Sequence, residues 1–301
     1  MRLISFGIEG RSSWGLWTER GVVDVGRRLP GCPTLRAALE TGALAAARDL
    51  LRAGVVADYA ADAVVLAPVV PDPGQVLCIG LNYEEHRAET RREPTGHPTV
   101  FARYPSSQVG HLGAMLLPPE STMFDYEGEL AVVIGRDCRR VAEADALSVI
   151  AGYSCYNDGS IRDFQRHTTQ FHAGKNWPAT GAFGPWLVTP DEVPDLESLS
   201  IQTRLNGQVV QSGTLDQLIF TIPRLIAYCS TFTPLRAGDV IVTGTPGGIG
   251  AARTPPLWMK PGDRVEVEIS GVGTLVNTVR EEAVAASGER RQPVAAAVAG
   301  A

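Results

Sequence analysis

The sequence predicts an α+β fold with a small N-terminal domain and a larger, β-rich second domain. Short apolar runs bounded by Gly, Pro and Asp, such as VLCIGL, ELAVVIG and DVIVTG, dominate the chain after residue 70 and are typical of strands. The helical segments lie irregularly between these runs instead of alternating in a βαβ rhythm, which favours α+β over a doubly wound sheet. The segment APVVPDPGQV interrupts the pattern with three prolines and a glycine, and it marks the boundary between the domains.

The elements expected in each domain follow from their apolar periodicity. In the N-terminal domain, residues 1–70, RLISFGIE and WGLWTERGVVDV predict paired strands, and the Ala- and Leu-rich TLRAALETGALAAARDLLRAG predicts helix. In the second domain, residues 71–283, further strands are predicted for GPWLVT, SIQTRLNG and RVEVEISGVGTLVNTV, and helices for EEHRAETRR, ADALSVIAG, SIRDFQRHT and LDQLIFTIPRLIAYCSTF. The Ala-rich tail, residues 284–301, lacks a periodic apolar face and is expected to be disordered.

Composition places the chain among globular proteins that act on small molecules. Its 301 residues, 44% of them hydrophobic, suffice for a large core. A net charge of -6 without any run of Lys or Arg argues against nucleic acid and membrane partners. The five scattered cysteines contain no C-x-x-C pair, which argues against a disulfide framework or a zinc ribbon. Because no apolar stretch is long enough for a signal peptide or a spanning helix, we expect a cytoplasmic protein.

Two carboxylates in FDYEGELAVVIGR, residues 124–136, form the strongest local pattern. Glu127 and Glu129 lie two residues apart at the start of an apolar strand, so both side chains project to one face. Their mutual repulsion must be offset by solvent, by a basic side chain or by a hard cation with oxygen ligands. Taken alone, the motif is explained more simply by a solvated strand edge, because Glu prefers surfaces.

The segment CYNDGSIRDFQRHTTQ, residues 155–170, joins a turn to a short helix. Asp158 lies in the Asn-Asp-Gly turn, and Ser160 is placed to cap the helix. Arg162 and Gln165 are three residues apart and can share a helical face. The arrangement places an acid, a cation and an amide at the opening of one possible binding site, although an ordinary surface Asp–Arg pair explains it equally well.

Two other segments carry polar groups at interpretable spacings. In LNYEEHRAETRR, His86 and Glu89 are neighbours on a helix, and the carboxylate would fix the imidazole tautomer of a general base for water. In GDVIVTGTPGGIG, a glycine-rich turn follows a strand but fits no nucleotide-binding pattern. It could bring backbone N–H groups and Thr245 near an anionic ligand, or it could serve only as a tight connection.

In this order, the segments resemble the motifs of the fumarylacetoacetate hydrolase family. GLNYEEH, DYEGELAVVIG, NDGSIRDFQ, GKNWPATGAFGPWLVT, TGTPGGIG and GDRVEVEISGVGTLVN carry the resemblance over about residues 71–280. It implies a catalytic domain whose mixed sheets form a roll or sandwich, in a homodimer. It also implies a divalent cation, Mg²⁺ with Mn²⁺ or Ca²⁺ as substitutes, bound by Glu127, Glu129 and Asp158.

The same resemblance assigns roles to six further residues. Lys175, in AGKNWP, would stabilise negative charge in the active site. His86 and Glu89 would form a dyad on a mobile helix that closes over the site and activates water. The positions matching substrate-binding residues of the family are Arg162, Gln165 and Thr245.

The function implied by the resemblance is hydrolysis of a C–C bond in a 1,3-dicarbonyl or acylpyruvate-type 2-oxo acid, through a metal-stabilised enolate, in aromatic catabolism. A decarboxylase, hydratase or isomerase of an unsaturated 2-oxo dicarboxylic acid is the alternative. A catalytically silent dimer that binds small acids is a second alternative, because fold does not determine function. GKNWP departs from the GKSFD-like sequence of many relatives, so Trp177 and Pro178 are expected to reshape the pocket wall.

Overall fold

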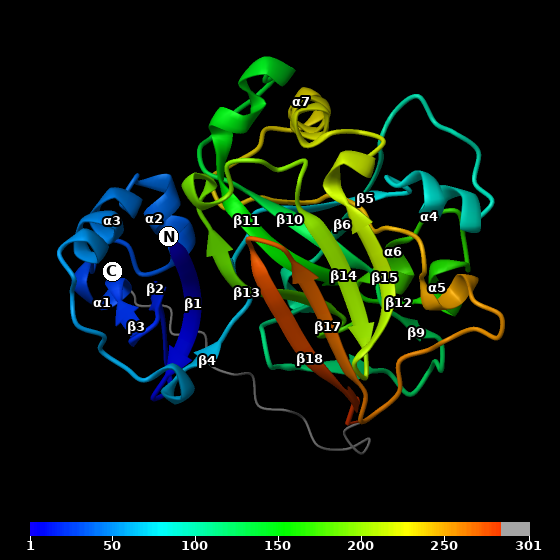
Figure 1. The fold of residues 1–301 in the computed structure, drawn as a ribbon, viewed down its shortest axis with the longest axis horizontal. Coiled ribbons are helices and arrows are strands. Elements are labelled where there is room, and N and C mark those ends of the chain that lie inside the picture. Colours follow the sequence, from blue (N-terminus) through cyan, green and yellow to red (C-terminus); the bar gives the residue numbers. More distant parts are fainter. Residues whose placement is uncertain (284–301) are drawn as a thin grey trace, which may run out of the picture.

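The computed structural model describes residues 1–283 and contains two large mixed sheets with helices around them (Figure 1). The strands are β1 (Arg2–Ile8), β2 (Arg11–Thr18), β3 (Gly21–Asp24), β4 (Val65–Leu66), β5 (Val76–Gly80), β6 (Thr99–Arg103), β7 (Gln108–Val109), β8 (Ala114–Leu117), β9 (Phe124–Asp125), β10 (Gly128–Ile134), β11 (Ile150–Asp158), β12 (Ser160–Ile161), β13 (Gly181–Val188), β14 (Ser200–Leu205), β15 (Gln208–Thr214), β16 (Val240–Val242), β17 (Arg264–Ile269) and β18 (Gly273–Glu281). The helices are α1 (Val25–Arg28), α2 (Leu35–Glu40), α3 (Leu44–Arg52), α4 (Glu84–Glu89), α5 (Arg162–Gln165), α6 (His172–Lys175) and α7 (Ile222–Phe232).

The two sheets form the expected roll or sandwich. The long sheet has 11 strands in the order β3-β2-β1-β13-β11-β10-β16-β5-β6, with β4 beside β1 and β7 beside β13. The second sheet has the order β15-β14-β17-β18-β8, and β9 pairs separately with β12. Strands β14, β17 and β18 pack on β10, β11 and β13, so the predicted mixed-sheet fold is confirmed.

Strand β10 is central because both of its faces are buried. Leu130 and Val132 face the core shared with β17 and β18, whereas Ala131 and Val133 face the core that includes Trp14. Burial on both faces explains why ELAVVIG is continuously apolar instead of alternating. Glu129 therefore lies on a strand that is enclosed on both faces.

The N-terminal segment extends the long sheet. Strand β1 pairs antiparallel with β13 through Arg2↔Val188 and Leu3↔Leu187. Helices α1 to α3 cover this segment, which lies at the left of the molecule (Figure 1). None of its residues lines the cavity described below.

The predicted helices are shorter than expected. ADALSVIAG forms a 3-10 turn that ends at Val149, because the chain then enters β11, where every residue is buried. SIRDFQRHT contributes only α5, and the Ser160 cap is wrong: its hydroxyl donates to the Asp158 carbonyl, and Ile161 occupies the N-cap without a side-chain bond. Within LDQLIFTIPRLIAYCSTF, α7 starts only at Ile222, since Pro223 favours the first turn of a helix.

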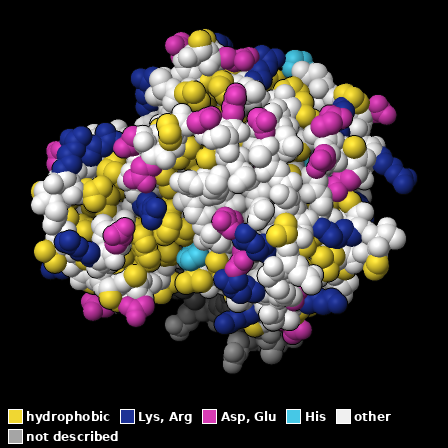
Figure 2. Space-filling model, in the orientation of Figure 1, with side chains coloured by type: hydrophobic (Ala, Val, Ile, Leu, Met, Phe, Trp, Pro, Cys, Tyr) yellow, Lys and Arg dark blue, Asp and Glu magenta, His cyan; other side chains and the backbone are white. Residues whose placement is uncertain are grey.

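The surface gives no indication of a nucleic acid partner. Acidic and basic side chains are interspersed over the face in Figure 2, without a continuous basic stripe. Among residues 1–283, no helix is both long enough and apolar enough to cross a bilayer. All five cysteines are free. The tail predicted to be disordered, residues 284–301, lies outside the described residues.

Candidate metal centre

Three carboxylates converge where β10 begins and β11 ends. The Asp158 N–H donates to the Glu127 carbonyl at 2.8 Å, so the antiparallel register places these residues opposite each other. Glu129 projects to the same face as Glu127 because strand side chains alternate. One carboxylate oxygen from each of the three lies within 4.8 Å of the others, and all three residues are buried. The E-x-E motif is therefore part of a buried cluster and not a solvated strand edge.

Buried cations neutralise two members of the cluster. The Lys175 ammonium donates to Glu127 Oε2 at 2.5 Å and to Asp158 Oδ2 at 2.6 Å. Arg162 Nη2 donates to Glu127 Oε1 at 2.7 Å, and Arg103 donates to Asp158. Burial opposes ionisation of Glu127, but Arg162 and Lys175 hold its pKa below the ordinary value. Burial likewise opposes the Lys175 charge, but Asp158 and Glu127 hold its pKa above the ordinary range.

Glu129 differs because no side-chain cation lies within hydrogen-bonding distance among residues 1–283. Burial, followed by the Asp158 and Glu127 charges, raises its pKa well above the ordinary value. Its Oε2 accepts the Gly244 N–H at 2.5 Å. The oxygens of these three carboxylates, one of which has no neutralising cation, form a set of ligands that fits a hard divalent cation. Since a carboxylate has about four acceptor positions, the hydrogen bonds to Lys175 leave room for coordination.

The loop after β16 uses its backbone N–H groups to fix acidic side chains around the site. The sequence left open whether this loop approaches an anionic ligand or serves only as a tight connection; here its N–H groups bind the protein's own carboxylates. The pairs are Gly244 with Glu129 (2.5 Å), Gly248 with Glu89 (2.9 Å), Gly250 with Asp125 (2.8 Å) and Ala251 with Asp125 (2.9 Å). Gly244 has φ +107°, and a Cβ there would lie 2.6 Å from the Asn82 Cβ, so a larger residue would displace the loop.

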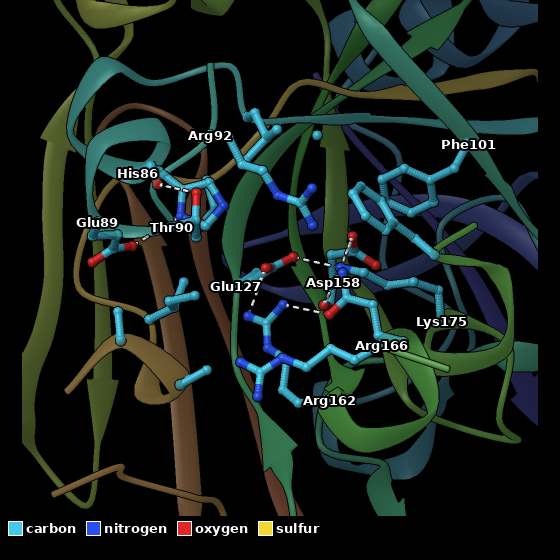
Figure 3. Close-up of a pocket in the computed structure, with 18 of the residues that line it drawn as sticks. His86, Glu89, Thr90, Arg92, Phe101, Glu127, Asp158, Arg162, Arg166 and Lys175 are labelled. Atoms are coloured by element: carbon cyan, nitrogen blue, oxygen red, sulfur yellow. Dashed lines mark hydrogen bonds and ion pairs between the residues drawn. The ribbon is translucent and has the colours of Figure 1, made fainter. Parts of the chain in front are cut away.

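The predicted dyad faces the same cavity. His86 and Glu89 lie on α4, and the His86 Nδ1 is 2.8 Å from Glu89 Oε1. The Glu89 carboxylate, which also accepts the Gly248 N–H, accepts from Nδ1 and leaves the lone pair on Nε2, for which residues 1–283 provide no hydrogen-bond partner. The cavity has a volume of about 330 Å³ and is lined by the dyad, the three carboxylates and Lys175 (Figure 3). This volume suits a small organic acid.

The predicted substrate-binding residues line the cavity, but the Arg162 guanidinium, the Gln165 amide oxygen and the Thr245 hydroxyl already have protein partners. Arg162 donates to Asp125 Oδ2 through Nε and to Gln165 Oε1 through Nη1, both at 2.8 Å. The Thr245 hydroxyl donates to the Gly128 carbonyl and accepts from Gln211 Nε2, again at 2.8 Å. Their substrate contacts therefore stay predictions.

Arg103 was missed by the sequence analysis. It ends β6, is 2% exposed, and donates to the Gly159 carbonyl at 3.0 Å and to Thr180 Oγ1 at 2.8 Å besides Asp158. No spacing in VFARYP marks it, and a lone cation within an apolar strand was the only available signal. Asp125 was visible in FDYEGE, but its role as the Arg162 partner depends on the fold.

The pocket wall also differs from the expectation. Trp177 and Pro178 are not among the residues that line the cavity; Trp177 packs edge-on against Phe164 with ring centroids 4.9 Å apart. Phe101 and Phe171 provide the aromatic wall instead. Trp177 is partly buried and packs against the hydrophobic core instead of the cavity.

Comparisons with known proteins point to one family. A family model described as fumarylacetoacetate (FAA) hydrolase C-terminal matches residues 75–280. The mitochondrial oxaloacetate tautomerase Fahd2a of Rattus norvegicus is 39% identical over 263 residues, covering 86% of this chain and 84% of that protein. The oxaloacetate tautomerase YisK of Bacillus subtilis (strain 168) is 40% identical over 225 residues, covering 73% and 75%.

A solved structure extends the likeness to nearly the whole chain. The crystal structure of maleylpyruvate hydrolase from Sphingobium sp. SYK-6, in complex with manganese(II) ion and pyruvate, superposes with a TM-score of 0.78 at 26% identity. The match covers 93% of this chain and 99% of that one. The protein is therefore a member of the fumarylacetoacetate hydrolase family.

Proposed function

We propose that the protein is a divalent-metal-dependent keto–enol tautomerase of a 2-oxo dicarboxylic acid, with oxaloacetate as the first substrate to test. The observation that carries the proposal is the His86–Glu89 dyad, which shares one small cavity with three buried carboxylates and Lys175. Two relatives named oxaloacetate tautomerases support isomerisation over the C–C hydrolysis favoured from sequence. Mg²⁺ is the proposed ion, with Mn²⁺ as its substitute in experiments.

The reaction needs charge stabilisation on one side of the substrate. Tautomerisation moves a proton from the carbon between two carbonyl groups to the oxygen of the ketone, so negative charge develops on that oxygen. A divalent cation held by Glu127, Glu129 and Asp158 would supply Lewis-acid stabilisation of this charge. The Lys175 ammonium, fixed by Glu127 and Asp158, adds a preorganised positive charge on the same side.

The proton is handled by the dyad. His86 Nε2 accepts it from carbon, the C–H electron pair forms the C=C bond, and the carbonyl π pair moves to oxygen. Glu89 accepts a hydrogen bond from the Nδ1–H group and so stabilises the imidazolium. The imidazolium then donates its proton to the enolate oxygen, so no water is consumed. Phe101 and Phe171, which pack edge-on against each other, line the same cavity and would restrict bulk water there.

A second candidate function uses the same residues for hydrolysis. His86 would take a proton from water, the hydroxide would attack the distal carbonyl of an acylpyruvate, and the C–C bond would break to release the enolate of pyruvate. The dyad geometry and the likeness to a maleylpyruvate hydrolase bound to manganese and pyruvate support this candidate.

The test follows decay of the enol absorbance of oxaloacetate with Mg²⁺-loaded protein. We expect His86→Asn to lower kcat by about 10²- to 10⁴-fold, the usual contribution of a general base. His97→Asn is the matched control, because His97 stacks on Tyr228 and does not line the cavity. A His86→Asn variant as fast as wild type would refute the dyad's role. Release of two acids from an acylpyruvate, without tautomerase activity, would establish hydrolysis instead.

A further inference from the structure

Cations that line the cavity fall into two groups. Arg162 and Lys175 are buried, and each is paired with two carboxylates. Arg91, Arg92 and Arg166 are exposed, and within residues 1–283 none of these side chains makes a salt bridge or hydrogen bond. The cavity therefore has three guanidinium groups that the protein does not neutralise, in addition to the charges of the metal centre.

Two of these arginines, Arg92 and Arg166, are labelled in Figure 3, and their side chains are placed differently. Figure 3 shows the Arg92 side chain directed into the cavity from the segment after α4, toward Glu127 and Asp158. The Arg166 side chain lies beside Arg162, which is already paired. A guanidinium that points into open space can hold a carboxylate through two parallel N–H donors. Arg92 is thus the better placed of the two to contact a ligand.

We propose that Arg92 binds the second carboxylate of a dicarboxylic substrate and determines the preference for diacids. The assignment rests on the proposed function, in which the 2-oxo acid end of the substrate lies against the carboxylate cluster. A carboxylate extending from that end toward the α4 side meets Arg92, whereas a monocarboxylic 2-oxo acid presents only a methyl or methylene group there.

Arg92 also belongs to the segment that carries the dyad. Its backbone N–H donates to the Arg87 carbonyl at 3.1 Å, which ties it to the last turn of α4. A substrate carboxylate held by Arg92 therefore anchors the helix that carries His86 and Glu89 over the reacting carbon. The second carboxylate contributes both to affinity and to the placement of the base.

The test compares two ligands that differ only at the distal end. Calorimetry with Mg²⁺-loaded protein measures the Kd of 2-oxoglutarate and of 2-oxopentanoate, in which a methyl group replaces the carboxylate. We expect Arg92→Gln to weaken 2-oxoglutarate about 10-fold or more, the value of a charge-assisted hydrogen bond, and to change 2-oxopentanoate by less than about twofold. Arg92→Lys, which keeps the charge without the planar donor pair, should lie between.

Arg166→Gln is the matched control, because it removes the same charge from the same cavity. We expect it to weaken both ligands similarly and by less than about threefold, as for a screened long-range charge. An equal change for both ligands in Arg92→Gln, no change in either, or selective loss in Arg166→Gln would overturn the assignment. Binding is measured without turnover, so selective loss in a protein that lacks tautomerase activity would refute the proposed function and leave this assignment standing.

Discussion

Replacing Glu129 with Gln distinguishes a metal-binding carboxylate cluster from a purely structural one. Glu129 is 2% exposed, lacks a cation partner, and lies beside the charges of Asp158 and Glu127. Gln can still accept the Gly244 N–H that now reaches Oε2. Without metal, Glu129→Gln should therefore be at least as stable as wild type, because Gln keeps the hydrogen bond and avoids the burial cost and charge repulsion that raise the pKa of Glu129.

With metal, the order of stability should reverse. An ion present at about 100 times its Kd stabilises the folded state by about 2.7 kcal/mol. For a chain of this size, that corresponds to a rise in Tm of about 4 °C. Loss of one of three ligands in Glu129→Gln should abolish most of this rise.

The assay is thermal unfolding with chelator and with Mg²⁺ or Mn²⁺. Glu120→Gln is the control, because Glu120 is exposed and forms no salt bridge in the described part of the chain. A Glu129→Gln variant that keeps the full metal-dependent rise in Tm would refute the triad. A large loss of stability in the variant without metal would instead mean that Glu129 holds the fold together.

Two further predictions concern packing and pH. A Cβ at Gly128 would lie 2.1 Å from Thr203 Oγ1, so Gly128→Ala should shift the start of β10 and weaken metal binding by on the order of 10-fold. Adding Thr203→Ala removes the clash and should restore much of the affinity in the double variant. Metal titrations that show no loss of affinity in Gly128→Ala would contradict this prediction. Burial, helped by Arg264, lowers the pKa of His111 to about 4. Because the unfolded imidazole titrates near 6.5, this contribution to stability is complete above about pH 6.5 and decreases toward pH 4, by up to about 2 kcal/mol after allowance for partial exposure. His111→Asn, which can still accept the Val276 N–H, should flatten this dependence in urea unfolding at several pH values, and an unchanged slope would rule out His111 as the cause.

Local periodicity was sufficient to predict two pairs of neighbouring side chains, but not that they belong to one site. Glu127 and Glu129 share a face because side chains alternate along any strand, and His86 and Glu89 meet because they lie three residues apart on a helix. These relations hold whatever the rest of the chain does. The resemblance supplied Asp158 and Lys175, which no spacing could have joined to the pair.

The rest depends on strand register and on loops. Asp158 reaches Glu127 only because β10 and β11 pair with Gly128 opposite Asn157. Arg103 lies on β6, an edge strand of the 11-stranded sheet, and its contact with Asp158 on β11 requires the whole tertiary fold. The lengths of the helices were overestimated for a related reason. The apolar residues after Val149 belong to a buried strand, and sequence periodicity alone cannot distinguish a buried strand from a buried helix.

Anomalous diffraction from crystals soaked with Mn²⁺ and oxalate tests the central claim most directly. The carboxylate oxygens already lie within 4.8 Å of one another, so we expect one strong manganese peak bonded to Glu127, Glu129 and Asp158, with oxalate chelating the ion on the side of the cavity that His86 faces. A manganese peak elsewhere, or none at this position under saturating Mn²⁺, would contradict the account.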